Sequence, residues 1–120
     1  MHAAILVVED DSHTCAQLVT LLEGEGYAVG TASDGYAALT WLRTNVAPRL
    51  VLLNLALSAP DGWQFLTARR ADGALARVPV VALSAAGKAL RPAALALGAD
   101  ELLSKPVNAA ALLVTAGRYR

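Results

Sequence analysis

Polar side chains stand directly after four short apolar runs of this sequence, and their types would suit phosphoryl chemistry. In chain order they are Glu9, Asp10 and Asp11, then Asn54, then Ser84, and finally Ser104 and Lys105. Adjacent carboxylates suit a hard divalent cation such as Mg²⁺, and a lysine beside a hydroxyl can hold a phosphoryl oxygen. An aspartate among them could form an acyl phosphate. Position 54, however, holds an amide.

Each of these features taken alone has a simpler explanation. An acidic cluster after a strand is more often the solvated start of a helix, and a single serine or Lys-Pro pair is a weak signal. His13 is expected to be an exposed residue of a first helical turn, and Cys15 a small core residue of the same helix. The joint placement of the polar residues after successive apolar runs, by contrast, favours one site.

The apolar runs alternate with segments of helical length. Four runs rich in valine, isoleucine and leucine, and a weaker fifth with a period of two, cover residues 5–8, 50–53, 78–83, 102–103 and 27–33. Continuous apolar runs are typical of a parallel sheet covered on both faces. Right-handed crossovers then give a single (βα)5 doubly wound α/β domain with helices on both faces. Ligands of this fold class bind beyond the carboxyl ends of the strands.

Capping residues support the helical segments between the runs. Two of these segments begin with a residue whose side chain can cap the helix, namely Ser12 and Asp61. Asp34 precedes a third segment, and Asn108 lies near the start of a fourth. Pro92 is placed as the first residue of another helix, since proline is preset for a first turn. Gly24 or Gly26 is expected to end the helix that Ser12 begins.

Composition limits the class of protein. The chain of 120 residues is 56% apolar with a formal net charge of zero, so we expect one folded domain over residues 1–120 and no direct contact with nucleic acid. Cys15 is the only cysteine, which excludes an internal disulfide and fits a reducing compartment. No signal peptide or membrane-spanning run is expected, so the predicted location is the cytoplasm.

Three segments together resemble the receiver domain of two-component response regulators, and the resemblance covers nearly the whole chain. ILVVEDD at 5–11 is similar to the family's first strand with its acidic pair, Glu9 and Asp10. LVLLNLALSAPDGW at 50–63 is similar to the third strand and its loop, with Asn54 in the phosphoacceptor position. GADELLSKP at 98–106 contains the family's lysine, Lys105. The resemblance implies a CheY-like, flavodoxin-like fold with strand order 2-1-3-4-5 and a role in phosphorelay signalling.

The family's remaining site residues are assigned by position. The resemblance implies that Ser84 and Lys105 are the phosphoryl-contacting hydroxyl and ammonium, and that Pro106 is the proline that family members often carry in a cis peptide. In the family, Mg²⁺ is held by the acidic pair, the acceptor and a backbone carbonyl two residues later. Here the corresponding metal ligands are Glu9, Asp10, Asn54 and the backbone carbonyl of Ala56, and loss of one negative ligand implies a weakened Mg²⁺ site or none.

The sequence departs from the family pattern at three positions. Asn54 cannot form an aspartyl phosphate, because an amide is uncharged and a very poor nucleophile. Ser58 stands where the loop usually has a proline, with Pro60 later, and Leu102 occupies the position of the switch aromatic. Without a carboxylate at position 54, the side chain of Lys105 has three alternatives, which are Glu9, Asp10 and solvent.

Three hypotheses follow for the function. The first is a degenerate receiver, not an enzyme, that acts as a phosphorylation-independent protein-interaction module. Its partners would be a sensor histidine kinase, an effector protein, or a second copy docked through the apolar face of the last two helices and the strand between them. The second is an ordinary Mg²⁺-dependent receiver with an engineered Asp→Asn change at Asn54. The third, a flavodoxin-like phosphate-ligand binding domain or hydrolase, lacks the expected glycine-rich phosphate loop.

Overall fold

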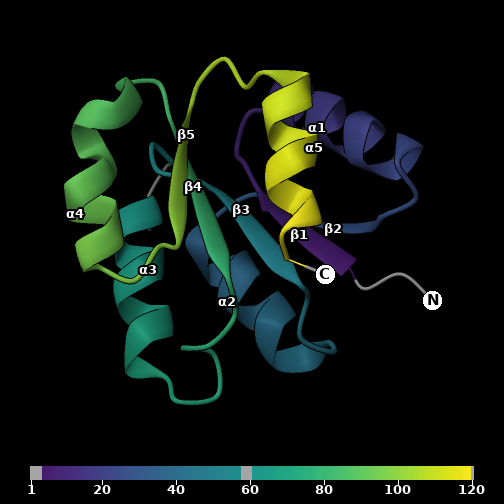
Figure 1. Cartoon of the computed structure of the whole chain (residues 1–120). Coiled ribbons are helices and arrows are strands. Elements are labelled where there is room, and N and C mark those ends of the chain that lie inside the picture. Colours follow the sequence, from purple (N-terminus) through teal and green to yellow (C-terminus); the bar gives the residue numbers. More distant parts are fainter. Residues whose placement is uncertain (1–3, 58–60, 120) are drawn as a thin grey trace.

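Five short strands form one parallel sheet in the part of the chain that the structure, a computed structural model, describes, namely residues 4–57 and 61–119 (Figure 1). The strands are β1 (Ala4–Val8), β2 (Ala28–Ala32), β3 (Leu50–Asn54), β4 (Val80–Ser84) and β5 (Glu101–Ser104). Their order across the sheet is β2-β1-β3-β4-β5. The doubly wound α/β fold and the strand order expected from the sequence are therefore confirmed.

The central strands are buried on both faces, which explains why they appear as continuous apolar runs. Every residue of β3 and of β4 is buried. Side chains alternate between the two faces because a strand has a period of two. In β1, Leu6 and Val8 pack in one hydrophobic core, whereas Ile5 and Val7 pack in the other. The sheet thus separates two hydrophobic cores. Because both faces of the sheet are covered, a binding site has room only at the ends of the strands.

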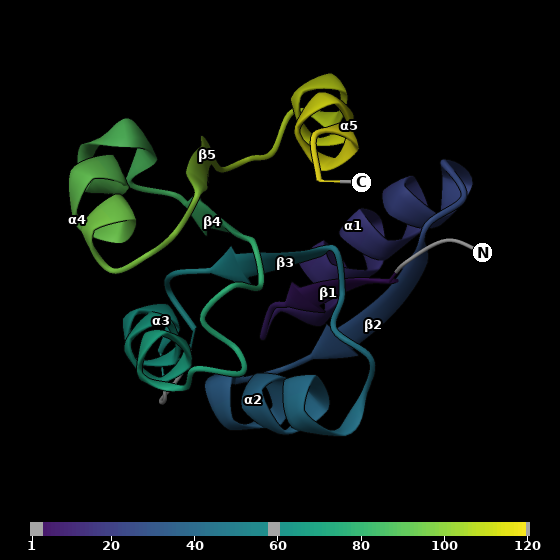
Figure 2. The ribbon, with the colours of Figure 1, turned by 60° about the horizontal axis from the view of Figure 1, so that its bottom comes forward.

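Helices cover both faces of the sheet. They are α1 (Ser12–Gly24), α2 (Gly35–Thr44), α3 (Gly62–Ala71), α4 (Arg91–Ala96) and α5 (Ala109–Gly117), with the short 3₁₀ helix η1 (Gly87–Leu90) before α4. α1 and α5 pack on the core that contains Ile5, and α2, α3 and α4 pack near the core that contains Leu6. Figure 2 shows these two layers on either side of the sheet. No helix within the described residues is long and apolar enough to cross a membrane.

Most of the predicted helix starts are confirmed. In α2, α3 and α5 the N-cap side chain accepts a hydrogen bond from the backbone N–H three residues later, and these caps are Asp34, Asp61 and Asn108. Gln64 completes a capping box at the start of α3, because its side chain accepts a hydrogen bond from the Asp61 backbone N–H at 2.8 Å. α1 ends at Gly24, one of the two expected positions.

Two predicted helix starts are wrong by one residue. Asp11, rather than Ser12, is the N-cap of α1, and its carboxylate accepts a hydrogen bond from the Thr14 backbone N–H at 3.1 Å. A charged acceptor at this position also interacts favourably with the helix dipole. The second correction concerns α4, which begins at Arg91 because the turn of η1 leads directly into it. Pro92 still lies in the first turn, where its missing N–H needs no partner.

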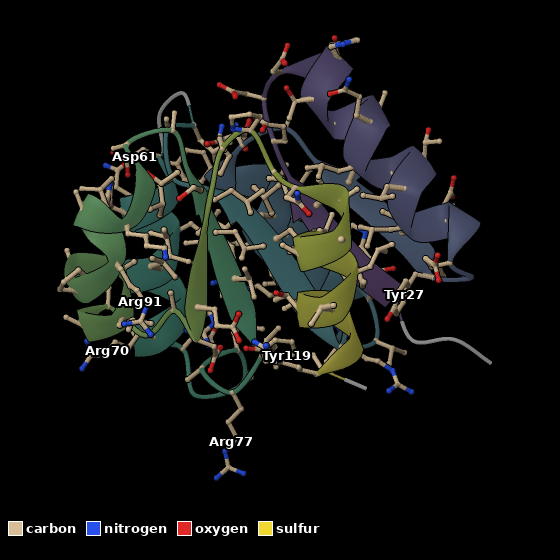
Figure 3. All side chains as sticks on the ribbon, turned by 45° about the horizontal axis from the view of Figure 1, so that its top comes forward. Tyr27, Asp61, Arg70, Arg77, Arg91 and Tyr119 are labelled. Carbon is tan, nitrogen blue, oxygen red and sulfur yellow. The ribbon has the colours of Figure 1, made fainter. Side chains whose placement is uncertain are left out.

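Two arginines of α3 form hydrogen bonds with backbone carbonyls outside this helix. Arg69 is buried, and its guanidinium donates to three backbone carbonyls, at 3.0 Å to Val78, 3.0 Å to Ala76 and 3.4 Å to Gly98. Burial lowers the pKa of Arg69, and the negative charge of Asp100 opposes this shift. Arg70 is exposed and donates to the carbonyl of Ala96 at 2.6 Å, on the side of the molecule that carries α4 (Figure 3).

Candidate functional site

The carboxyl ends of β1, β3, β4 and β5 place the predicted site residues along one edge of the sheet. The register pairs Val8 of β1 with Leu53 of β3, and Asn54 of β3 with Leu83 of β4. Ser84 of β4 is paired in turn with Ser104 of β5. The residues that follow these pairs therefore adjoin one another, as parallel strands require, although they lie far apart in the sequence.

Glu9 is the centre of this site. Its side chain is only 1% exposed, and both of its carboxylate oxygens accept hydrogen bonds. Oε1 accepts from Nζ of Lys105 at 2.8 Å. Oε2 accepts from Nδ2 of Asn54 at 2.8 Å and from the backbone N–H of Asp11 at 3.3 Å. The buried negative charge of Glu9 is therefore balanced by an ammonium and solvated by two further N–H donors of the chain.

Asn54 ends β3 with its side-chain amide held in one direction. The residue is buried, and its Oδ1 accepts a hydrogen bond from the backbone N–H of Ala56 at 3.2 Å. Its Nδ2 donates to Glu9 and lies 3.5 Å from Oδ1 of Asp10. Exchanging the amide oxygen and nitrogen would set an oxygen against the Glu9 carboxylate and an NH₂ group against a backbone N–H. The hydrogen-bond network thus directs the NH₂ group of Asn54 at the acidic pair.

The structure chooses among the three alternatives for Lys105. Its ammonium pairs with Glu9 at 2.8 Å, and the side chain is 20% exposed. The backbone N–H of Lys105 also donates to the carbonyl of Ser84 at 2.9 Å, which ties the end of β5 to the end of β4. The peptide bond between Lys105 and Pro106 is cis, as the family resemblance implies.

The other predicted residues have different surroundings. Ser84 is buried, and its hydroxyl accepts a hydrogen bond from the backbone N–H of Ala86 at 3.1 Å. Asp11 is exposed and caps α1, and the hydrogen bonds from Thr14 lower the pKa of its carboxyl. Asp11 therefore contributes its backbone N–H to the site, whereas its carboxylate caps the N-terminus of α1.

Three residues singled out in the sequence lie around the site rather than in it. Leu102, which the resemblance assigns to the position of the switch aromatic, is buried in the core beneath α3 and α4. His13 is exposed as predicted, and Cys15 is half-buried in α1. Burial, reinforced by the nearby charge of Glu9, raises the pKa of the Cys15 thiol. The loop departures at Ser58 and Pro60 lie outside the described residues.

The donor set as arranged does not fit a divalent cation. Mg²⁺ takes oxygen ligands, and within the described residues no group of three carboxylate, imidazole or thiol side chains is placed to hold a metal ion. Asn54 faces Glu9 with its NH₂ group, whereas the weak metal site predicted from the sequence needs the amide oxygen. Asp10 is exposed at the mouth of the site, and both oxygens of Glu9 already accept hydrogen bonds.

Gly62 is a site-supporting residue that the sequence analysis missed. A Cβ atom at this position would lie 2.6 Å from Cα of Leu55 and 2.8 Å from the carbonyl oxygen of Asn54. Both neighbours are backbone atoms that cannot swing aside, so only glycine lets the start of α3 lie this close to the end of β3. The Asp-Gly pair at 61–62 was interpreted only as a helix start, because the close contact depends on tertiary structure.

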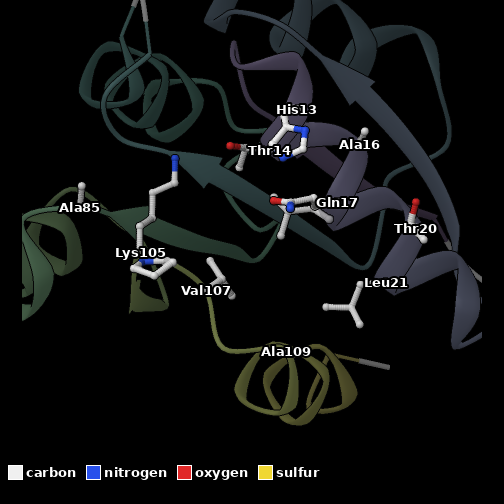
Figure 4. Close-up of a pocket in the computed structure, with 12 residues that line it drawn as sticks. His13, Thr14, Ala16, Gln17, Thr20, Leu21, Ala85, Lys105, Val107 and Ala109 are labelled. Atoms are coloured by element: carbon white, nitrogen blue, oxygen red, sulfur yellow. The ribbon is translucent and has the colours of Figure 1, made fainter.

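A groove of about 1020 Å³ next to Lys105 was also not predicted. It lies between α1 and the connection from β5 to α5, and Figure 4 shows Lys105 and Val107 facing Thr14 and Gln17 of α1. Leu21 of α1 forms part of its apolar lining. These residues of α1 are 84 or more positions from Lys105 and Val107 in the chain, so no local pattern could predict that they line one groove.

The fold and the polar residues at its sheet edge define a receiver domain of the kind used in two-component signalling. The family model of the response regulator receiver domain matches residues 5–116, and the chain belongs to this family. Receiver domains of the family typically bind Mg²⁺ in the active site and are generally not enzymes in their own right.

Two curated relatives are full-length regulators. The transcriptional regulatory protein CpxR homolog of Haemophilus influenzae is 40% identical over 87% of this chain and 44% of its own length. The DNA-binding response regulator MtrA of Mycobacterium tuberculosis is 37% identical over 88% of this chain and 45% of its own length. The chain therefore spans less than half the length of these two relatives.

Two solved structures have the same fold along nearly their whole length. The chemotaxis response regulator CheY4 of Vibrio cholerae has a TM-score of 0.90 and 26% identity, with 100% of both chains covered. The receiver domain of the sensor histidine kinase PA1611 of Pseudomonas aeruginosa has a TM-score of 0.89 and 28% identity, covering 99% of this chain and 98% of its own. That receiver domain holds a magnesium ion in its active site cleft.

Proposed function

We propose that this receiver domain is a protein-interaction module whose state does not depend on phosphorylation. The observation that supports the proposal most directly is the residue at the phosphoacceptor position. Asn54 has neither the charge nor the nucleophilic oxygen that forms an acyl phosphate, and its NH₂ group is directed at Glu9. Ser84 and Lys105 keep the positions from which family members contact a phosphoryl group, but here Lys105 is engaged by Glu9.

Leu102, at the family's switch position, also supports the proposal. The switch residue of the family is an aromatic side chain, which this chain replaces with a leucine packed in the core. A buried leucine has no polar tip that could favour an outward position. A domain without a phosphoacceptor therefore also has no obvious means of passing a phosphorylation signal to α4, β5 and α5.

An alternative hypothesis is an ordinary receiver in which Asn54 replaces a natural aspartate. It is supported by the retention of Glu9, Asp10, Ser84 and Lys105 at one edge of the sheet. Both hypotheses give the same behaviour for the chain as it stands. They differ in whether a restored carboxylate would restore the whole phosphorylation response or only uptake of the phosphoryl group, because Leu102 replaces the switch aromatic. The three concurrent departures, at Asn54, Leu102 and the loop after β3, favour the degenerate receiver.

The chain with its own sequence is expected to remain unmodified by a small-molecule phosphodonor. Incubation with acetyl phosphate and Mg²⁺, followed by intact mass spectrometry, should show only the unmodified mass, because position 54 offers no carboxylate. A receiver domain that has first been shown to take up a phosphoryl group from acetyl phosphate is the positive control for the donor. A stoichiometric mass gain of one phosphoryl group on this chain would refute the proposal.

We further propose that the partner-binding surface is the face formed by α4, β5 and α5, and that a second copy of the chain binds there. Val114 of α5 is 61% exposed and is one of the large exposed hydrophobic residues of the described chain. Exposed alanines lie beside it at 110 and 111. With a formal net charge of zero, the domain has no basic excess for a phosphate backbone, so it contacts protein rather than DNA in this proposal.

The substitution Val114→Glu is expected to shift the chain from dimer to monomer, because a carboxylate would be buried in the apolar contact. Sedimentation velocity over a range of concentrations measures the change. Val46→Glu, at an exposed valine between α2 and β3, is the matched control and should leave the dimer intact. A natural chain that stays monomeric at millimolar concentration would count against the homodimer.

A further inference from the structure

We infer that the ammonium of Lys105 is the built-in cation of this site and holds the ends of β1, β3 and β5 together without a divalent metal. The inference rests on the proposed function, since a site that never receives a phosphoryl group leaves Lys105 with its internal partner at all times. It assigns Lys105 a positioning role that differs from contact with a phosphoryl oxygen.

The burial of Glu9 makes a cation necessary. A carboxylate removed from water is strongly destabilising unless it is paired and hydrogen-bonded. Glu9 is 3% exposed, and within the described structure its donors come from three parts of the chain. The ammonium of Lys105 supplies the positive charge at 2.8 Å, and Asn54 and the backbone of Asp11 supply the remaining hydrogen bonds.

The amide of Asn54 favours the ammonium of Lys105 over a divalent cation as the partner of Glu9. A divalent cation on Glu9 would have to displace Lys105 or Asn54 from its oxygens, and it would then face the NH₂ group of Asn54 rather than an oxygen. Turning the amide around would break its bonds to Glu9 and to the Ala56 backbone together. An aspartate at position 54 would reverse this preference, since it adds a negative oxygen in place of a donor.

The pairing also fixes the wall of the groove beside α1. Lys105 and Val107 line one wall of the groove. The ion pair joins Lys105 to Glu9, which follows the end of β1. Glu9 in turn accepts a hydrogen bond from Asp11, the N-cap of α1 on the opposite wall. Both walls of the groove are thus joined through one buried carboxylate, and their spacing is set by contacts of the chain itself.

Thermal unfolding with and without millimolar MgCl₂, and with no phosphodonor present, tests the inference. The natural chain should show no change in Tm on addition of MgCl₂. Lys105→Met should lower Tm by about 10 °C in the absence of metal, because Glu9 then stays buried without its cation. MgCl₂ should recover part of that loss, since an external cation can now occupy the place of the ammonium.

Arg118→Met is the matched control, because it breaks an ion pair of similar length on the surface. Arg118 lies 2.9 Å from Glu101, but its side chain is 59% exposed, so the substitution should change Tm little and leave it insensitive to MgCl₂. If Lys105→Met behaves like Arg118→Met, or if MgCl₂ stabilises the natural chain as much as the Lys105 variant, the inference is wrong.

The double variant Glu9→Gln with Lys105→Met covers the case in which Lys105→Met does not fold. Removing both charges should restore folding and abolish any response to MgCl₂, because no buried carboxylate remains. A double variant that still responds to MgCl₂ like the single variant would overturn the inference. These outcomes are separate from a failure of the proposed function, which would appear as phosphorylation of the natural chain.

Discussion

Asn54→Asp is expected to give a domain that takes up one phosphoryl group from acetyl phosphate in the presence of Mg²⁺. The substitution supplies the missing nucleophilic oxygen at the end of β3 and a third carboxylate beside Glu9 and Asp10. Lys105 and Ser84 already lie at the same edge of the sheet. Intact mass spectrometry measures the gain, which should disappear when Mg²⁺ is replaced with EDTA.

The same substitution should make the stability of the domain depend on Mg²⁺. Asn54 donates to Glu9 at 2.8 Å, and a carboxylate in its place would instead repel Glu9, which destabilises the metal-free domain by about 1–3 kcal/mol. MgCl₂ should reverse much of this loss. Asn108→Asp, at the exposed N-cap of α5, is the matched control, because aspartate caps a helix as well as asparagine does.

The outcome of this experiment shows how far the pocket differs from that of an ordinary receiver. A phosphorylated Asn54→Asp variant, the result expected here, would show that the lost carboxylate alone accounts for the phosphorylation-independent state of the natural chain. A variant that folds but stays unmodified would show that the pocket has changed beyond position 54. That second result would contradict the expectation that one residue silences the pocket.

Arg69→Met is expected to reduce the free energy of unfolding by about 3 kcal/mol or more. Arg69 is 3% exposed, and its guanidinium donates hydrogen bonds to carbonyls on two loops, so methionine would leave buried acceptors without donors. The loss is large compared with the roughly 5–15 kcal/mol that is the typical free energy of unfolding of a domain. Urea denaturation followed by circular dichroism measures it.

Arg70→Met provides the comparison at the adjacent position. Arg70 makes a single 2.6 Å hydrogen bond to the carbonyl of Ala96 and is exposed. Water can replace that donor, so the change should be about 0.5–1 kcal/mol. Equal destabilisation by the two substitutions would show that burial of Arg69 has no special importance for the packing of α3 against the loops around α4.

The strands and most helix starts could be predicted because their signals are local. The runs at 50–53 and 78–83 lie close to β3 and β4, since a strand buried on both faces must be apolar throughout. Asp61 could be identified as a cap, and Asp34 as the residue before a helix, because a capping side chain acts within three residues. The start of α1 was misplaced by one residue because Asp11 and Ser12 are both good caps, and the sequence does not rank them.

The internal contacts of the site could not be predicted because they join distant residues. Glu9 and Lys105 are separated by 96 positions, and the choice among Glu9, Asp10 and solvent depends on side-chain geometry at the sheet edge. The direction of the Asn54 amide depends on the backbone of Ala56. Arg69 and Arg70 are adjacent in the sequence, yet only the packed structure distinguishes the buried guanidinium from the exposed one.

The central claim is that neither Mg²⁺ nor a phosphodonor changes the state of this receiver domain. An amide NMR titration of the natural chain tests it most directly. A ¹⁵N-labelled sample would receive MgCl₂ and then acetyl phosphate, with the backbone signals of Glu9, Ala56 and Lys105 followed throughout. We predict that these signals stay in place, because Lys105 and Asn54 already occupy the oxygens of Glu9. Saturable movement of the three signals with either reagent would contradict the account.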